Sequence, residues 1–127
     1  MSHLRSTVLL AVASAALLVP AATANTDIHY FGQTAKGQFS FQLDPSGTVK
    51  HVHNFHFITR CGAVQVQHRF PVTVHNGKQT FHYRTHNGNW TITGELDVNG
   101  PGSAAGTVSD WRAKVCEHVP WTAHVRR

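Results

Sequence analysis

The chain of 127 residues has little of what would define a common enzyme or a cysteine-rich scaffold. Its two cysteines are too few for a disulfide-dense miniature fold, and its only methionine is Met1. Beyond residue 24 the only leucines are Leu43 and Leu96, and residues that favour strands outnumber those that favour helices. No G-x-S-x-G elbow, phosphate-binding glycine loop or H-E-x-x-H helix occurs in the sequence. These absences argue against a helical domain and against several common enzyme classes.

The first 24 residues have the pattern of a secretory signal peptide. Arg5 precedes an apolar run over 8–19, and a small-residue ending, Ala22-Thr23-Ala24, fits a cleavage site. The run is about a dozen residues long, whereas a membrane-spanning helix needs roughly 20. We therefore predict cleavage after Ala24, no transmembrane segment afterwards, and a single secreted domain over 25–127.

Alternation of apolar and polar residues is the main structural signal in that domain. It is clear over 39–43 and clearest over 90–98, and Asn76-Gly77 is a strong hairpin turn signal. Short strands separated by turn residues, with no helical spacing, predict an all-β fold. We expect an antiparallel β-sandwich of seven to nine strands, with a small closed β-barrel as the alternative.

The two cysteines, Cys61 and Cys116, both lie in the predicted exported part of the chain. Oxidising compartments permit disulfides, whereas a cysteine-based metal site usually has more cysteines or a C-x-x-C spacing. We predict one disulfide between them. It would close a loop of about 55 residues and stabilise the domain by roughly 4 kcal/mol on the chain-entropy model.

Eleven histidines are the most unusual feature of the composition, beside a formal net charge of +5. His51 and His53 form an H-x-H triplet, which on a strand places two imidazoles on one face, and His56 lies nearby. A zinc or copper site is one interpretation, but His56 has the wrong parity unless the strand bulges near Asn54. The simpler interpretation is that the histidines are polar surface residues of strands and loops with no specific ligand.

A third interpretation is a surface whose charge depends on pH. Histidine side chains gain positive charge as the pH falls toward 5, which would strengthen attraction to anionic cell-envelope polymers or surfaces. Such binding would also be sensitive to salt.

Acidic and aromatic residues give weaker signals. Glu95 and Asp97 fall on one face of the strand expected over 90–98, at a spacing compatible with a glycosidase pair. Outward-facing polar positions of a regular strand are the favoured explanation. Trp90, Trp111 and Trp121 could form a sugar-stacking platform, but their positions favour the core.

Several short motifs resemble a group of small, exported, uncharacterised β-domains of actinobacteria and related bacteria. The resemblance covers 36–127, and the motifs are Arg60-Cys61-Gly62, Ile92-Thr93-Gly94, Ala105-Gly106-Thr107-Val108, Val115-Cys116 and Trp121-Thr122-Ala123. It implies the β fold, export and the disulfide, and it implies no catalytic residue.

The sequence thus predicts a monomeric, non-enzymatic binding module at or outside the cell surface, with a basic, pH-responsive, histidine-bearing face. An anionic envelope polymer is the expected partner, and nucleic acid is not expected. Metal binding through the histidines is the alternative, and a small hydrolase is a third hypothesis.

Overall fold

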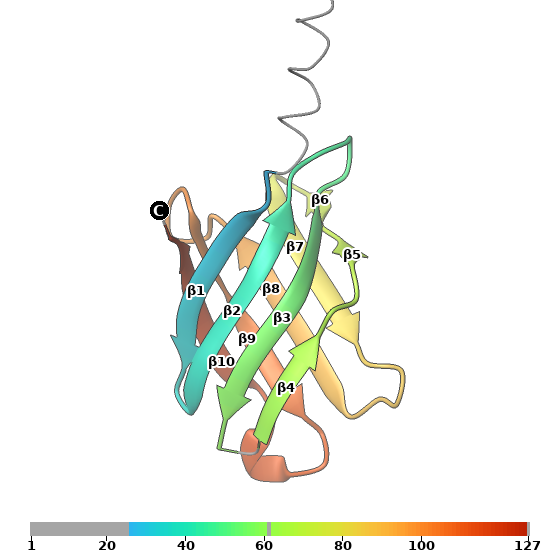
Figure 1. Cartoon of the computed structure of the whole chain (residues 1–127), viewed down its shortest axis with the longest axis vertical. Helices are drawn as coiled ribbons and strands as arrows, with labels where there is room; N and C mark the ends of the chain where they lie inside the picture. Colours follow the sequence, from blue (N-terminus) through green and yellow to red (C-terminus); the bar gives the residue numbers. More distant parts are fainter. Residues whose placement is uncertain (1–25, 61, 127) are drawn as a thin grey trace, which may run out of the picture.

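The computed structural model describes residues 26–60 and 62–126 (Figure 1). The predicted signal peptide and Cys61 lie outside the described residues. No helix in the described ranges is long and apolar enough to cross a membrane.

Ten strands and one short 3-10 helix make up the described structure, and every strand pairing is antiparallel. The elements are β1 (Ile28–Thr34), β2 (Gly37–Asp44), β3 (His51–Thr59), β4 (Gly62–Val66), β5 (Phe70–Pro71), β6 (Thr73–His75), β7 (Lys78–Arg84), β8 (Trp90–Leu96), β9 (Ser103–Asp110), η2 (Lys114–Cys116) and β10 (Val119–Val125). The prediction of an all-β antiparallel fold is confirmed.

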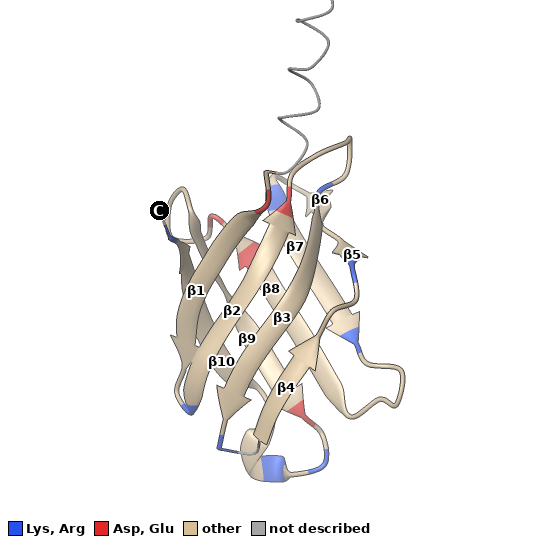
Figure 2. Ribbon diagram, in the orientation of Figure 1, with Lys and Arg blue, Asp and Glu red and all other residues tan. Residues whose placement is uncertain are grey.

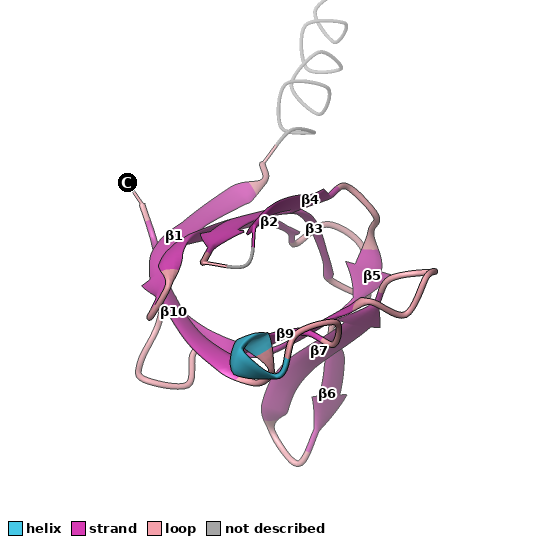
Figure 3. Cartoon of the chain, turned by 90° about the horizontal axis from the view of Figure 1, so that it is seen from below, coloured by secondary structure: helices cyan, strands magenta, loops and turns pink. Residues whose placement is uncertain are grey.

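All ten strands belong to one sheet. Its order is β4-β3-β2-β1-β10-β9-β8-β7-β6, with β5 paired to β3. The sheet curls into a half-barrel around a common interior, as seen along its axis in Figure 3. The two separate sheets expected for a sandwich are not confirmed, and the strand count exceeds the seven to nine expected.

The two ends of the curled sheet meet through side chains. Phe70 of β5 stacks on Tyr83 of β7 with ring centroids 4.7 Å apart, and it also contacts Phe81. Pro71 cannot donate a backbone hydrogen bond, so the short β5 suits an edge position, as the proline suggested. Aromatic packing therefore joins the ends where no strand pairing is found between described residues.

Aromatic rings fill the interior. Phe39 and Trp121 stack with centroids 4.2 Å apart, and both side chains are 1% exposed. The other large, fully buried side chains are Phe41, Phe55, Phe57, Ile92, Val52 and Val108. They come from β2, β3, β8 and β9, where the period-two pattern, interrupted in β3 between Val52 and Phe55, places them on the inner face.

Gly94 makes room for these rings at the centre of β8. A Cβ atom at this position would lie 2.3 Å from Phe81 and 2.7 Å from Trp121. The glycine that interrupts the apolar side of the strand therefore lets two aromatic side chains approach the backbone.

Trp90 and Trp121 lie in the core, as expected, but Trp111 does not. Trp111 is 41% exposed, because β9 ends at Asp110 and the tryptophan begins the following loop. The expectation that all three tryptophans fill the core was wrong for Trp111.

The core predicts a large difference between two phenylalanines that are eight residues apart. Phe39→Ala should lower the free energy of unfolding by about 3–5 kcal/mol, because it removes a buried ring and leaves a cavity. The same exchange at Phe31, which is 36% exposed, should cost about 1 kcal/mol or less. Urea denaturation of the two variants measures both values, and equal losses would contradict this description of the core.

Candidate binding face

Five of the histidines lie on the outward side of β3, β1 and β10, and β2 separates β3 from β1. They are His51, His53, His56, His29 and His124. Strand register brings them near one another: Gln42 of β2 pairs with both His29 and His53, and Phe31 of β1 pairs with His124. We call this surface the histidine face.

A bulge at Asn54 places His56 on the same side as His51 and His53. The register between β2 and β3 shifts there, so that Ser40 pairs with His56 while Gln42 pairs with His53. Asn54 takes a left-handed conformation with φ of 54°, which asparagine tolerates better than most residues. The strand thus bulges near Asn54, as His56 requires in order to share a face with His51 and His53.

The bulge is held by a chain of polar contacts. The Asn54 side-chain amide donates to the Gln42 side-chain oxygen over 2.5 Å. The Gln42 amide nitrogen lies 3.3 Å from the His29 ring nitrogens. These contacts link β3, β2 and β1 across the histidine face.

The three predicted metal ligands share a face without forming a metal cluster. His53 Nε2 lies 3.1 Å from a carboxylate oxygen of Asp27, and both side chains are largely buried. Within residues 26–60 and 62–126, no three His, Cys, Asp or Glu side chains are grouped closely enough to hold a metal ion. Zinc or copper binding by His51, His53 and His56 stays a prediction, because the described structure does not bring these three side chains together around one point.

A groove of about 490 Å³ adjoins the histidine face, and His56 is the histidine that lines it. Its lining residues are Phe31, Gly32, Gln33, Gln38, Phe39, Ser40, His56 and Arg126. Ser40 is small and stands between the larger Phe31 and His56, to which it pairs on either side, which leaves the surface hollow. The lining contains two groups that can carry positive charge and no carboxylate.

Arg126 is held at the edge of this groove. Its guanidinium lies 4.3 Å from the centroid of the Phe31 ring, and its backbone N–H donates to the His29 carbonyl. His29 stacks near the same ring, with centroids 6.3 Å apart. Among the described residues Arg126 forms no ion pair, so its charge is available to a ligand.

The acidic residues at the border of the histidine face are already engaged. Asp27 binds His53, and Asp44 accepts hydrogen bonds from the Ser46 hydroxyl at 2.6 Å and from Arg69 at 2.7 Å. The Ser46 side chain, followed by Arg69, holds the pKa of the Asp44 carboxyl well below its usual range. The carboxylates therefore do not neutralise Arg126.

The acidic pair Glu95 and Asp97 is separated by the end of a strand. Glu95 points outward from β8, but Asp97 lies beyond it with φ of 56°. The Asp97 carboxylate accepts hydrogen bonds from the Gly102 N–H at 2.9 Å and from Gln79 at 3.3 Å. The prediction that Glu95 and Asp97 share one strand face was wrong. β8 ends at Leu96, and the Asp97 side chain accepts a hydrogen bond within the loop that follows.

Cys116 is 3% exposed and sits in η2. Its predicted partner, Cys61, lies outside the described residues, so the disulfide stays a prediction. Figure 1 places the end of β3 and the start of β4 at the same end of the molecule as η2.

Sequence reasoning missed Phe31 and Arg126. Phe31 lies out of phase with the inward Ile28 and Tyr30, and no motif or alternation marks Arg126. They meet only because β1 pairs with β10, a contact between the two ends of the domain.

Comparison with protein-family models, curated proteins and solved structures finds no match to this chain. The resemblance to exported actinobacterial β-domains therefore stays an expectation from the sequence motifs.

The left-handed backbone at Asn54 predicts a specific response to substitution. Asn54→Val should lower the free energy of unfolding by about 1–2 kcal/mol, because a branched side chain is strained in this conformation. Asn54→Gly should cost less than half as much, because glycine adopts it freely. Urea denaturation tests this, and an order reversed between the two variants would contradict the bulge.

Asp44 predicts a pH-dependent contribution to stability. Its pKa is lower in the folded protein than in the unfolded chain, so its contribution is present above about pH 4 and is lost as the pH falls. Asp44→Asn should therefore destabilise the protein at pH 7 and make a smaller difference near pH 3. Denaturation of both proteins at the two pH values gives the result, and a constant difference would contradict it.

Proposed function

We propose that this protein is a binding module, not an enzyme, and that it binds an anionic polymer at or outside the cell surface through the histidine face. The observation that carries the proposal is the groove beside Phe31, where Arg126 and His56 line a surface without a carboxylate. Action outside the cell rests on the predicted signal peptide alone.

The permanent charge of Arg126 and the pH-dependent charge of the histidines would contribute differently to binding. Arg126 supplies a permanent positive charge, held by Phe31, while Gln33, Gln38 and Ser40 offer hydrogen bonds to hydroxyl or carboxylate groups. Histidine side chains add positive charge as the pH falls through the range near 6.5, where imidazoles titrate. Affinity for a polyanion should therefore rise under acidic conditions.

The charges around the histidine face leave this pH effect intact. The acidic residues beside the face are Asp27, which precedes β1, and Asp44 at the end of β2; they face His53 and Arg69 respectively. The neighbouring strand β4 carries no charged residue, and the outward positions of β9 are Ser103, Ala105, Thr107 and Ser109. Glu95 is the next outward carboxylate, on β8, where it pairs with Ala105.

The proposal predicts a pH-dependent affinity for a carboxylated polysaccharide. Polygalacturonate should bind more tightly at pH 5.5 than at pH 7.5 and less tightly in high salt, whereas uncharged dextran should not bind. Arg126→Gln should weaken binding about two- to fivefold at both pH values, the range that exposed ion pairs give. His56→Gln should mainly reduce the difference between the two pH values. Isothermal titration calorimetry measures these affinities.

His75→Gln is the matched control, because His75 is exposed in β6, outside the histidine face. It should leave the affinity unchanged. Equal binding at both pH values, or equal losses from His56→Gln and His75→Gln, would overturn the proposal.

A further inference from the structure

Basic residues gather at one end of the molecule, which we call the η2 end. It consists of the β1–β2 turn, Arg60 after the end of β3, the β7–β8 loop and the loop 111–118 that contains η2. Figure 2 shows Lys and Arg at these turns, at the end opposite the chain's C-terminus. The basic residues are Lys36, Arg60, Arg84, Arg112 and Lys114.

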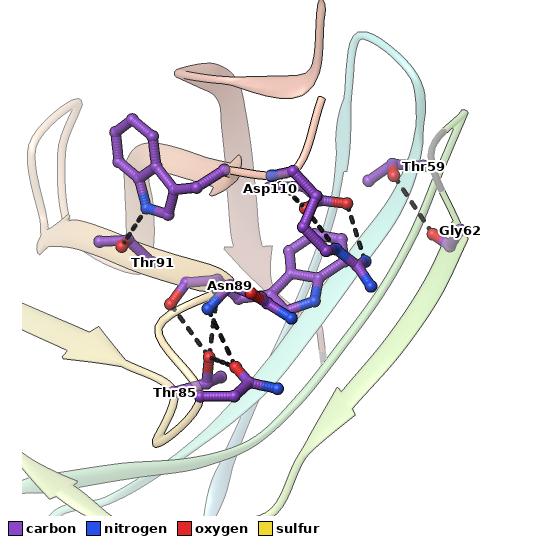
Figure 4. A network of polar contacts seen from close by, with 10 residues as sticks. Thr59, Gly62, Thr85, Asn89, Thr91 and Asp110 are labelled. Carbon is purple, nitrogen blue, oxygen red and sulfur yellow. Dashed lines mark hydrogen bonds and ion pairs between the residues drawn. The ribbon is translucent and has the colours of Figure 1, made fainter. Parts of the chain in front are cut away.

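The acidic residues described at this end do not offset that charge. Asp110 is 3% exposed, and Arg112 donates to both of its carboxylate oxygens over 2.9 Å (Figure 4). These hydrogen bonds lower the pKa of Asp110, so the pair is an internal bridge. Once this pair is set aside, the charged side chains described at this end are four basic ones and one acidic one, Glu117. The basic side chains are those of Lys36, Arg60, Arg84 and Lys114.

Two apolar side chains project among these charges. Trp111 is 41% exposed and Val115 is 62% exposed. The indole N–H of Trp111 donates to the Thr91 hydroxyl over 2.6 Å (Figure 4). The His118 ring meets the indole edge-on, with ring centroids 5.3 Å apart. Because the only polar group of the indole is bonded within the protein, its exposed part is apolar and held in place.

The short η2 fixes the direction of Val115. Cys116, the next residue, is buried, and the Cys116 N–H donates to the Ala113 carbonyl over 2.8 Å. Lys114 is exposed on the other side of Val115. The loop therefore presents a lysine and a valine together at its tip, above a buried anchor.

We propose that the η2 end docks on the surface of an anionic lipid bilayer. Val115 and Trp111 enter the boundary between headgroups and acyl chains, while the four unpaired basic side chains face the lipid phosphates. A water-borne polyanion would satisfy the charges but would leave Val115 without an apolar partner. The combination of charge with protruding apolar side chains therefore favours a bilayer.

Vesicle sedimentation of the intact protein tests this site. Vesicles of phosphatidylcholine mixed with an equal amount of phosphatidylglycerol should bind the protein, and phosphatidylcholine alone should not. Lys114→Gln should weaken binding about fivefold, the usual effect of one basic residue at an anionic membrane. Val115→Ser should weaken it about tenfold, because it removes an inserted apolar side chain.

The chain offers matched controls away from this end. Val74 is 69% exposed in β6, and Lys78 is exposed at the start of β7, so Val74→Ser and Lys78→Gln repeat the two exchanges elsewhere. Both should bind vesicles like the wild type. Trp111 gives a second readout: its fluorescence should shift to the blue on vesicle binding, and Trp111→Phe should lose the shift.

The results separate this site from the histidine face. Arg126→Gln should leave vesicle binding unchanged, and Val115→Ser should leave polygalacturonate binding unchanged. Equal binding to both kinds of vesicle, or equal losses from Val115→Ser and Val74→Ser, would overturn the membrane site. Loss of polygalacturonate binding in Lys114→Gln without an effect on vesicles would reassign the η2 end to a polymer.

Discussion

The stack of aromatic rings inside the curled sheet is the constraint on which the rest of the structure depends. Phe39 and Trp121 lie face to face, and Phe41, Phe55 and Phe81 pack around them. These rings fill the middle of the interior at close-packed distances. The candidate binding face described above lies on the outer surface, where side chains that do not serve the core are found.

The same alternation that fills the core distributes chemistry on the outside. Inward aromatic residues alternate with outward residues, so that Ser40 and Gln42 face outward on either side of Phe41. One extra residue at Asn54 resets this alternation and brings His56 to the side of His53. A local backbone irregularity thus decides which histidines share a surface.

The sequence allowed much of this fold to be predicted where local patterns are strong. The alternation at 39–43 and 90–98 corresponds to β2 and β8, and Asn76-Gly77 forms the β6–β7 turn with φ of 52° and 78°. β1 was missed, because Phe31 and Gly32 interrupt its pattern. The groove was beyond prediction, because Phe31 and Arg126 are brought together by the pairing of β1 with β10, which no local pattern encodes.

The position of β10 has a consequence for how the domain is assembled. The last strand of the chain lies between β1 and β9, in the interior of the sheet order, and it contributes Trp121 to the centre of the core. Until this strand arrives, β1 and β9 have no partner on that side and the ring stack lacks its largest member. Folding therefore depends on contacts between residues about 90 positions apart, which is the kind of topology that folds slowly. A domain that lacks β10 therefore exposes two unpaired strand edges, which are templates for pairing with another chain.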